Sequence, residues 1–213
     1  MFNKVSVLVD NNSWILVYAE QLVDELIARG ITAALYRNQA DIPKGDVCFL
    51  LGCTQLVIED VLARNKYNLV VHESALPQGK GFAPMAWQII AGQHIIPVSL
   101  IEASTEVDSG DIWLQENIVL TGNELCREWR AMQGEISVRL ALRFVDQYEQ
   151  LSPTPQQGKE SFYPRRTPLD SELDPRLSLN ELMPLLRTVD NQNYPAFFYY
   201  NGQKFRLEIH KDD

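Results

Sequence analysis

The sequence predicts an α/β fold in which helices cover both faces of a mostly parallel central sheet. Short apolar runs rich in β-branched residues, such as Val5–Val9 and Val47–Leu51, alternate with segments whose apolar residues recur every three or four positions. The connections between these segments are short, which is typical of parallel strands joined by helices. At 213 residues the chain is long enough for one good core and a small appendage.

Six strands are expected in the first part of the chain. They are Val5–Val9, Ile31–Tyr36, Val47–Leu51, Leu69–Val71, Ile95–Ile101 and Ile112–Leu120. Helices are expected from Ser13, a candidate N-cap, to Gly30, over about Gln55–Arg64, over about Pro84–Ile90, and from Leu125 to Tyr148. Thr121 and Glu124 have the spacing of a capping box for the last of these helices.

The composition changes after residue 150, where Leu151–Gly158 is rich in proline, glutamine and glycine and is typical of a linker. Beyond it, Ser178 and Glu181 form a second capping box, and Asn201-Gly202 between two apolar runs predicts a β-hairpin. We therefore expect a catalytic-type domain over residues 1–150, a linker over 151–162, and a helix-plus-hairpin appendage over 163–213 without a core of its own.

The net charge of the chain indicates which class of partner it can bind. A net charge of −9 argues against nucleic acid, because phosphate binding needs a basic field. No apolar run approaches the roughly 20 residues that span a bilayer, and the first residues lead straight into a strand rather than a signal peptide. A cytoplasmic location and no membrane partner are expected. The three cysteines, Cys48, Cys53 and Cys126, are expected to be free thiols.

The first strand is followed by Asp10-Asn11-Asn12-Ser13, which lacks the glycine pattern of a dinucleotide site. No Walker pattern occurs in the chain, so neither NAD nor ATP is supported. The free N–H groups of the following helix could hold an anion here, or the four residues could only turn the chain and cap the helix.

Two residues stand out as candidates for proton chemistry. His72 ends a strand, at the sheet edge where ligands collect in open α/β folds, and Asp108 lies in a loop before Gly110. An imidazole beside a carboxylate is the usual arrangement for proton handling. From the residues alone, His72 could equally be a core histidine and Asp108 a turn residue.

The stretch around the histidine resembles the signature of the formyltransferases that use N10-formyltetrahydrofolate: His72-x-Ser74-x-Leu76-Pro77-x-Gly79-x-Gly81-x-x-Pro84-x-x-Trp87-x-Ile89. Their second motif is similar to Asp108-x-Gly110-x-Ile112, at a fitting distance along the chain. The segment that begins at Arg165-Arg166-Thr167-Pro168 resembles the one that follows the catalytic domain in sugar N-formyltransferases. The likeness covers most of the chain and implies a Rossmann-like formyltransferase fold.

The resemblance also implies roles for residues. His72 would stabilise the oxyanion or move a proton, Asp108 would orient the histidine and accept the amine proton, and no metal is implied. The folate co-substrate would contact Leu51, Gly52, Val107, Ser109 and Gly110. The acceptor would be a small molecule, a nucleotide-linked amino sugar, and would contact Asp10, Asn11, Asn12, Ser13 and Lys80.

Two positions depart from the family pattern. The family usually has an asparagine two residues before the histidine, where this chain has Val70, and often a histidine seven residues before the aspartate, where it has Ile101. Asn68 is too far along the strand to replace the asparagine. Ser74, Gln78 or a backbone N–H could supply the missing hydrogen-bond donor, and loss of one such donor costs about 10²–10³ in rate.

Other functions of the same fold are weighed against this one. Methionyl-tRNA as acceptor is disfavoured by the charge, and because the tRNA enzymes of the family carry a longer C-terminal barrel domain. Hydrolysis of formyl-tetrahydrofolate and a non-catalytic module that binds folate or a nucleotide sugar are the alternatives. The aromatic C-terminal hairpin could pack on the main sheet, or form a lid or a homodimer contact.

Overall fold

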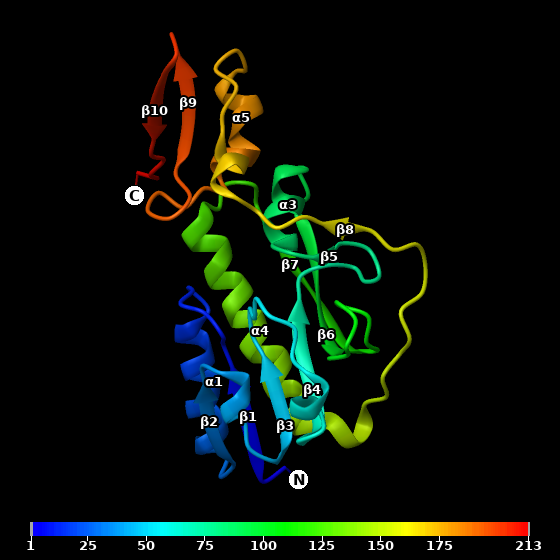
Figure 1. Cartoon of the computed structure of the whole chain (residues 1–213). Helices are drawn as coiled ribbons and strands as arrows, with labels where there is room; N and C mark the ends of the chain where they lie inside the picture. The colour runs from blue at the N-terminus through cyan, green and yellow to red at the C-terminus, as the bar shows by residue number, and fades with distance from the viewer. Residues whose placement is uncertain (1, 213) are drawn as a thin grey trace.

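The computed structural model describes residues 2–212. At its centre is a six-stranded sheet with the strand order β2-β1-β3-β4-β6-β7. The strands are β1 (Lys4–Leu8), β2 (Thr32–Tyr36), β3 (Gly45–Leu50), β4 (Asn65–His72), β6 (Ile95–Glu102) and β7 (Ile112–Val119). Strands β2, β1, β3 and β4 are parallel, whereas β6 is antiparallel to both β4 and β7 (Figure 1). The predicted mostly parallel α/β fold is confirmed.

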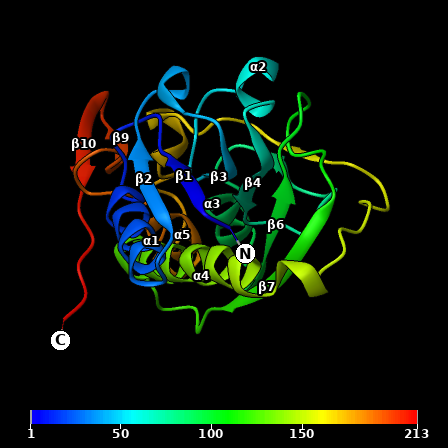
Figure 2. The same cartoon turned by 90° about the horizontal axis from the view of Figure 1, so that it is seen from below.

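Helices cover both faces of this sheet. The long helices α1 (Leu16–Ala28) and α4 (Cys126–Gln147) lie side by side on one face, and the short α2 (Glu59–Leu62) lies on the other (Figure 2). Alternation along the strands explains both contacts: Val7 points into the core beneath α1 and α4, while its neighbour Leu8 packs with Val61 of α2. The remaining elements of the first half are η1 (Gln39–Asp41), β5 (Lys80–Gly81) and α3 (Pro84–Ile90).

Two predicted caps differ from the structure. Helix α1 begins at Leu16 after Ile15, without a side-chain cap, and Ser13 takes part only in a backbone turn. Glu124 does accept hydrogen bonds from Thr121, but the pair closes a separate turn, because α4 begins later, at Cys126. In both cases the first apolar residue of the helical pattern, Ile15 or Leu125, precedes the first residue with helical hydrogen bonds.

The C-terminal quarter crosses the main domain before it forms its own elements. After η2 (Tyr148–Gln150), the chain reaches β8 (Phe162–Tyr163), which pairs in parallel with β5. It continues through η3 (Pro168–Ser171), α5 (Leu179–Leu186), β9 (Ala196–Tyr200) and β10 (Gln203–Leu207). The predicted hairpin is present, and both Asn201 and Gly202 have the positive φ of a type I′ turn.

The appendage has a small apolar cluster of its own, which differs from the expectation. Leu173, Leu182, Leu186, Val189 and Ala196 are buried together. Its junction with α4 is polar: the Trp129 indole donates to the Arg187 carbonyl at 2.9 Å, and Arg130 pairs with Asp190 at 2.7 Å. Within residues 2–212, no helix combines the length and apolar character needed to cross a membrane.

Candidate active site

A cavity of about 470 Å³ lies at the carboxyl ends of the parallel strands. Its size is within the range of small-molecule sites. Its walls come from the segment after β1, the ends of β3 and β4, the start of α3, the β6–β7 loop, one side of α4 and the segment around Arg165. Segments distant in sequence therefore meet where an open α/β fold binds its ligands.

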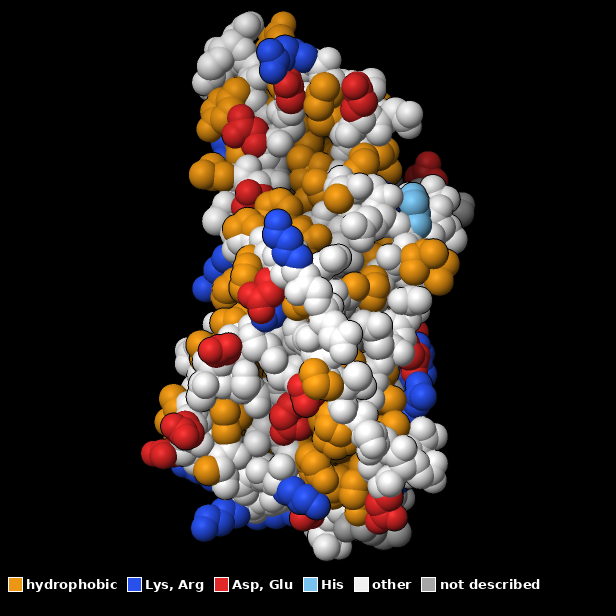
Figure 3. Space-filling model, turned by 90° about the vertical axis from the view of Figure 1, so that its right-hand side faces the viewer, with side chains coloured by type: hydrophobic (Ala, Val, Ile, Leu, Met, Phe, Trp, Pro, Cys, Tyr) orange, Lys and Arg blue, Asp and Glu red, His pale blue; other side chains and the backbone are white. Residues whose placement is uncertain are grey.

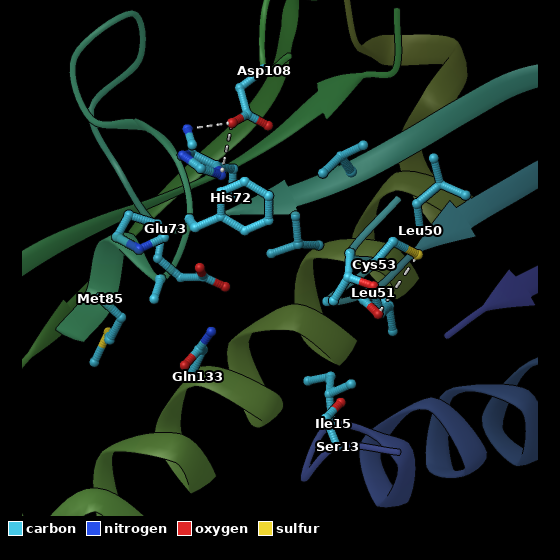
Figure 4. Close-up of a pocket in the computed structure, with 18 of the residues that line it drawn as sticks. Ser13, Ile15, Leu50, Leu51, Cys53, His72, Glu73, Met85, Asp108 and Gln133 are labelled. Carbon is cyan, nitrogen blue, oxygen red and sulfur yellow. Dashed lines mark hydrogen bonds and ion pairs between the residues drawn. The ribbon is translucent and has the colours of Figure 1, made fainter. Parts of the chain in front are cut away.

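His72 and Asp108 come together on one wall of this cavity (Figure 4). The His72 Nδ1 atom lies 3.6 Å from the Asp108 Oδ2 atom, and both side chains are largely buried. The Gly81 backbone N–H donates to the same carboxylate oxygen at 2.8 Å. The structure thus brings the two sequence candidates into one cluster.

The hydrogen bonds of His72 define its tautomer. Its Nε2 atom lies 2.8 Å from the Gly79 carbonyl oxygen, which can only accept, so Nε2 carries a proton. In the neutral ring, Nδ1 then has a lone pair facing Asp108. A proton taken up at Nδ1 would be stabilised by the carboxylate, so the pair is arranged to receive a proton at that atom.

Backbone geometry fixes the two loops of the site, the one that carries Asp108 and the one that runs from His72 to Gly81. Asp108 has a φ of 49°, a left-handed conformation that costs energy in a residue other than glycine. Gly81 has a φ of 97°, and a side chain there would meet the Tyr163 carbonyl. The linker supports both loops: Ser161 Oγ accepts from the Gly79 N–H, and Gln156 donates to the carbonyl of Asp108.

The residues expected to contact folate divide into two groups. Leu51, Gly52 and Val107 line the cavity. Ser109 lies behind the wall, where its hydroxyl accepts a 2.9 Å hydrogen bond from Lys80, and Gly110 packs against the backbone of β6. These two residues shape the aspartate loop rather than the cavity surface.

The residues expected to contact the acceptor also divide. Asn11 and Ser13 line the cavity. The Asp10 carboxylate accepts from the N–H groups of Thr54 and Gln55, and Asn12 accepts from Arg37, so both hold loops.

Lys80 is a further member of the expected acceptor group. It is buried, with 3% of its side chain exposed, and its ammonium pairs with Glu160 of the linker at 2.6 Å. It therefore ties the histidine loop to the linker.

The two departures from the family pattern face each other. Val70 of β4 and Ile101 of β6 are register partners, and Val70 is in turn paired with Leu50 of β3. All three line the cavity as one apolar row. The two positions that depart from the family pattern are therefore neighbours in the sheet, and together they form an apolar pair.

None of the side chains considered as a replacement donor lines the cavity. Asn68 is buried and donates to the Leu62 carbonyl, Ser74 is buried, and Gln78 is exposed. The cavity does present other amides, which are Gln133 from α4 on the opposite wall, Asn11 and Gln55.

Sequence reasoning missed several polar residues of the cavity: Glu73, Arg130, Gln133, Arg165 and Arg166. A signal for Gln133 exists in the helix pattern. Gln133 and Ser137 follow Trp129 at steps of four, so polar residues interrupt the buried face of α4 where it borders the cavity. Glu73 gave no signal, because a charged residue after a strand is usually in solvent.

Burial changes the acid–base properties of several groups near the site. It raises the pKa of Glu73, and it raises that of Glu102 despite hydrogen bonds from Trp113 and Asn68. The pKa of Cys53 rises to about 12, through burial and then the charge of Asp10, and burial raises that of Cys126 to about 11. The expected free thiols are confirmed. Among residues 2–212, no group of three or more histidine, cysteine or acidic residues is placed to hold a metal.

Comparison with known proteins supports the family resemblance. Residues 28–128 match the family model described as formyl transferase. The resemblance to formyltransferases is confirmed. A methionyl-tRNA formyltransferase from Ehrlichia canis is 24% identical over 164 residues, which is 76% of this chain and 52% of that protein. The chain thus spans about half the length of this curated relative.

Solved structures share the fold. A likely sugar N-formyltransferase from Mycobacterium tuberculosis, Rv3404c, aligns with a TM-score of 0.77 at 18% identity, covering 100% of this chain and 99% of that one. HypX from Aquifex aeolicus, in complex with tetrahydrofolic acid, aligns with a TM-score of 0.80 at 18% identity over 98% of this chain and 37% of HypX. The expected Rossmann-like formyltransferase fold is confirmed by these matches.

Proposed function

We propose that the chain transfers a formyl group from N10-formyltetrahydrofolate to the amine of a nucleotide-linked amino sugar. The observation that carries the proposal is the buried His72–Asp108 pair at the wall of a 470 Å³ cavity. The match of residues 28–128 to the formyl transferase model supports the same chemistry.

The arrangement of the pair suits amine formylation. As the amine nitrogen bonds to the formyl carbon, it must lose a proton, which His72 Nδ1 is placed to receive while Asp108 stabilises the imidazolium. The bond between the formyl carbon and N10 of the folate then breaks, and the proton passes to N10. The products are a formamide and tetrahydrofolate.

The folate is assigned to the side of the cavity formed by Leu51, Gly52 and Val107. HypX, which shares the fold, has been solved with tetrahydrofolic acid, and this supports folate as the co-substrate. The apolar row of Leu50, Val70 and Ile101 adjoins these residues and offers a flat aromatic ring a surface without competing hydrogen bonds.

Two arginines support an anionic acceptor. Arg165 and Arg166 line the cavity, and within residues 2–212 neither forms a salt bridge with a carboxylate. Arg165 lies over the Phe82 ring and Arg166 over the Trp87 ring. Guanidinium groups bind phosphate oxygens in pairs, so these two fit the diphosphate of a nucleotide-linked sugar.

Transfer RNA suits the surface less well. The net charge is −9, and on the face shown in Figure 3 basic and acidic side chains are interspersed rather than gathered into a basic field. The apolar Val70–Ile101 pair favours a second candidate function, a module that binds folate or a nucleotide sugar without catalysis, because it removes a hydrogen-bond donor beside His72.

The test is a panel assay. The protein is incubated with N10-formyltetrahydrofolate and nucleotide-linked 3-amino and 4-amino sugars, and tetrahydrofolate release is followed. Release that depends on an amine is expected. Release without an amine would indicate hydrolysis, and binding of the folate without release would indicate the non-catalytic module.

A further inference from the structure

Glu73 is the unusual residue of the cavity. It directly follows His72 at the end of β4, and only 8% of its surface is exposed. Its carboxyl group points toward the Gln133 amide of α4 (Figure 4). Gln88 donates to the Glu73 backbone carbonyl at 2.5 Å and thereby fixes the main chain at this point. The backbone is held firmly while the side chain faces the cavity.

The other acidic side chains around the cavity already have partners or lie in solvent. Asp190 pairs with Arg130, Asp108 accepts from the Gly81 N–H beside His72, and Glu102 accepts from Trp113. Glu106 is exposed at the rim. Among residues 2–212, Glu73 is thus the buried carboxylate of the cavity for which no salt bridge is found, and its hydrogen bonds come from the Gln133 side chain and from its own backbone N–H.

Two donors do not fill a buried carboxylate. The ionised group has about four acceptor positions, and the Gln133 side chain and the Glu73 backbone N–H occupy two of them. Burying a charge without a cationic partner is costly, and buried charges in proteins are usually paired. The unfilled positions of Glu73 face the space that a ligand would occupy.

We propose that Glu73 recognises the acceptor by binding its amine as an ammonium group, and that it removes the first proton. The three N–H donors of a primary ammonium complement the carboxylate and the adjacent Gln133 amide oxygen. This inference rests on the proposed formyl transfer and narrows the acceptor to primary amines that arrive charged.

The proposed steps account for both protons that the ammonium group loses. The ammonium gives one proton to the Glu73 carboxylate, which becomes a neutral acid, and leaves a free amine with a lone pair. That amine attacks the formyl carbon, and its second proton passes to His72 Nδ1 and then to N10 as the C–N10 bond breaks. The Glu73 proton leaves to solvent with the product, which restores the carboxylate.

The test compares two probes that differ in one group: a dTDP-linked 4-amino-4,6-dideoxyglucose and the corresponding dTDP-6-deoxyglucose, which has a hydroxyl instead of the amine. Binding is measured by calorimetry at pH 7 with tetrahydrofolate present. The wild-type protein is expected to prefer the amine by tenfold or more, the scale of a charge-assisted hydrogen bond. Glu73→Gln should abolish the preference, Glu73→Asp should retain part of it, and Glu20→Gln on the exposed side of α1 should leave it unchanged.

Stability provides a second readout that separates recognition from a structural role. Burial raises the pKa of Glu73, with the charges of His72 and Asp108 acting in opposite directions on it. An acid with a raised pKa in the folded state destabilises the fold as pH rises above its unfolded pKa. Glu73→Gln should therefore raise the melting temperature at pH 7, whereas a structural role predicts that it falls.

Equal binding of the two probes by the wild-type protein, or an amine preference that survives in Glu73→Gln, would overturn the inference. A lower melting temperature of Glu73→Gln would also count against it. The binding measurement does not need catalysis, so the two proposals can fail separately. The panel assay can show no formyl transfer while the protein still prefers the amine probe. Formyl transfer can also be found in a protein that binds the two probes equally.

Discussion

The two ring nitrogens of His72 have different tasks. Nε2 donates to the Gly79 carbonyl at 2.8 Å, which fixes the ring, and Nδ1 faces Asp108 at 3.6 Å, which leaves room for a proton to arrive. Because the Gly81 N–H holds the Asp108 carboxylate, that group stays in place whether or not the histidine is charged. The histidine loop thus orients both members of the pair.

Loss of either member should remove the proton acceptor of the reaction. His72→Ala and Asp108→Asn are each expected to lower amine-dependent tetrahydrofolate release by about 10²–10⁴, the usual contribution of general acid–base catalysis. Circular dichroism should show an unchanged fold. His94→Ala is the control, because His94 is exposed and lies outside the cavity. Near wild-type release in either variant would remove the pair from the mechanism.

At the scale of elements, the short β5–β8 pair joins the histidine loop to the linker. Lys80 is paired with Phe162 and Gly81 with Tyr163. The pair contains only a few hydrogen bonds, so it depends on the close approach of the two backbones at Gly81, where a Cβ would lie 2.5 Å from the Tyr163 carbonyl oxygen. The linker is therefore part of the support of the site.

Gly81→Ala should separate these two segments. The positive φ alone costs an alanine about 1–2 kcal/mol, and the contact with Tyr163 adds to that cost. We expect a loss of unfolding free energy in chemical denaturation and at least tenfold slower tetrahydrofolate release, because the Gly81 N–H also holds Asp108. In Gly92→Ala the φ penalty is similar but no atom lies within 4 Å, so release should be unaffected. Equal effects in both variants would show that the close approach of β5 and β8 does not support the site.

At the scale of the whole molecule, the appendage sits above the carboxyl ends of the parallel strands and closes one side of the cavity (Figure 1). Its junction with the main domain is electrostatic: Arg130 of α4 pairs with Asp190, and Lys211 pairs with Glu128. Burial opposes ionisation of Asp190, but hydrogen bonds from Arg130 and Asn193 outweigh it and lower its pKa to about 2.

Asp190→Asn should weaken this junction in a pH-dependent way. The folded pKa of about 2 lies below the ordinary aspartate value of 3.8, so the stabilisation is present above pH 3.8 and is lost as the pH falls through about 2. At pH 7 we expect a loss of about 1.5–3 kcal/mol in unfolding free energy, the range for hydrogen bonds to charged groups. The difference from wild type should vanish at the lowest pH.

Asp174→Asn is the matched control for this measurement. The Asp174 pKa is also lowered to about 2, first by the Arg176 side chain, but the two residues are close in sequence and the pair is exposed. It can therefore persist in the unfolded chain, and its loss should not change stability measurably. A pH-independent effect of Asp190→Asn would show that the junction is not electrostatic.

The sequence by itself determined the local elements and the motif that marks the site. β-Branched runs formed the strands, Asn201-Gly202 formed its hairpin, and the pattern from His72 to Gly81 indicated a formyltransferase. Each of these depends on neighbouring residues, whose backbone preferences act regardless of the rest of the chain.

The tertiary structure alone decided what surrounds His72. It placed Asp108 beside the ring, set Val70 opposite Ile101, buried Lys80 against Glu160 and turned Glu73 into the cavity. Burial and pairing depend on segments that meet only after folding. The local sequence around a charged residue at the end of a strand does not tell whether its side chain lies in solvent or in a cavity. Its partners are therefore known only from the structure.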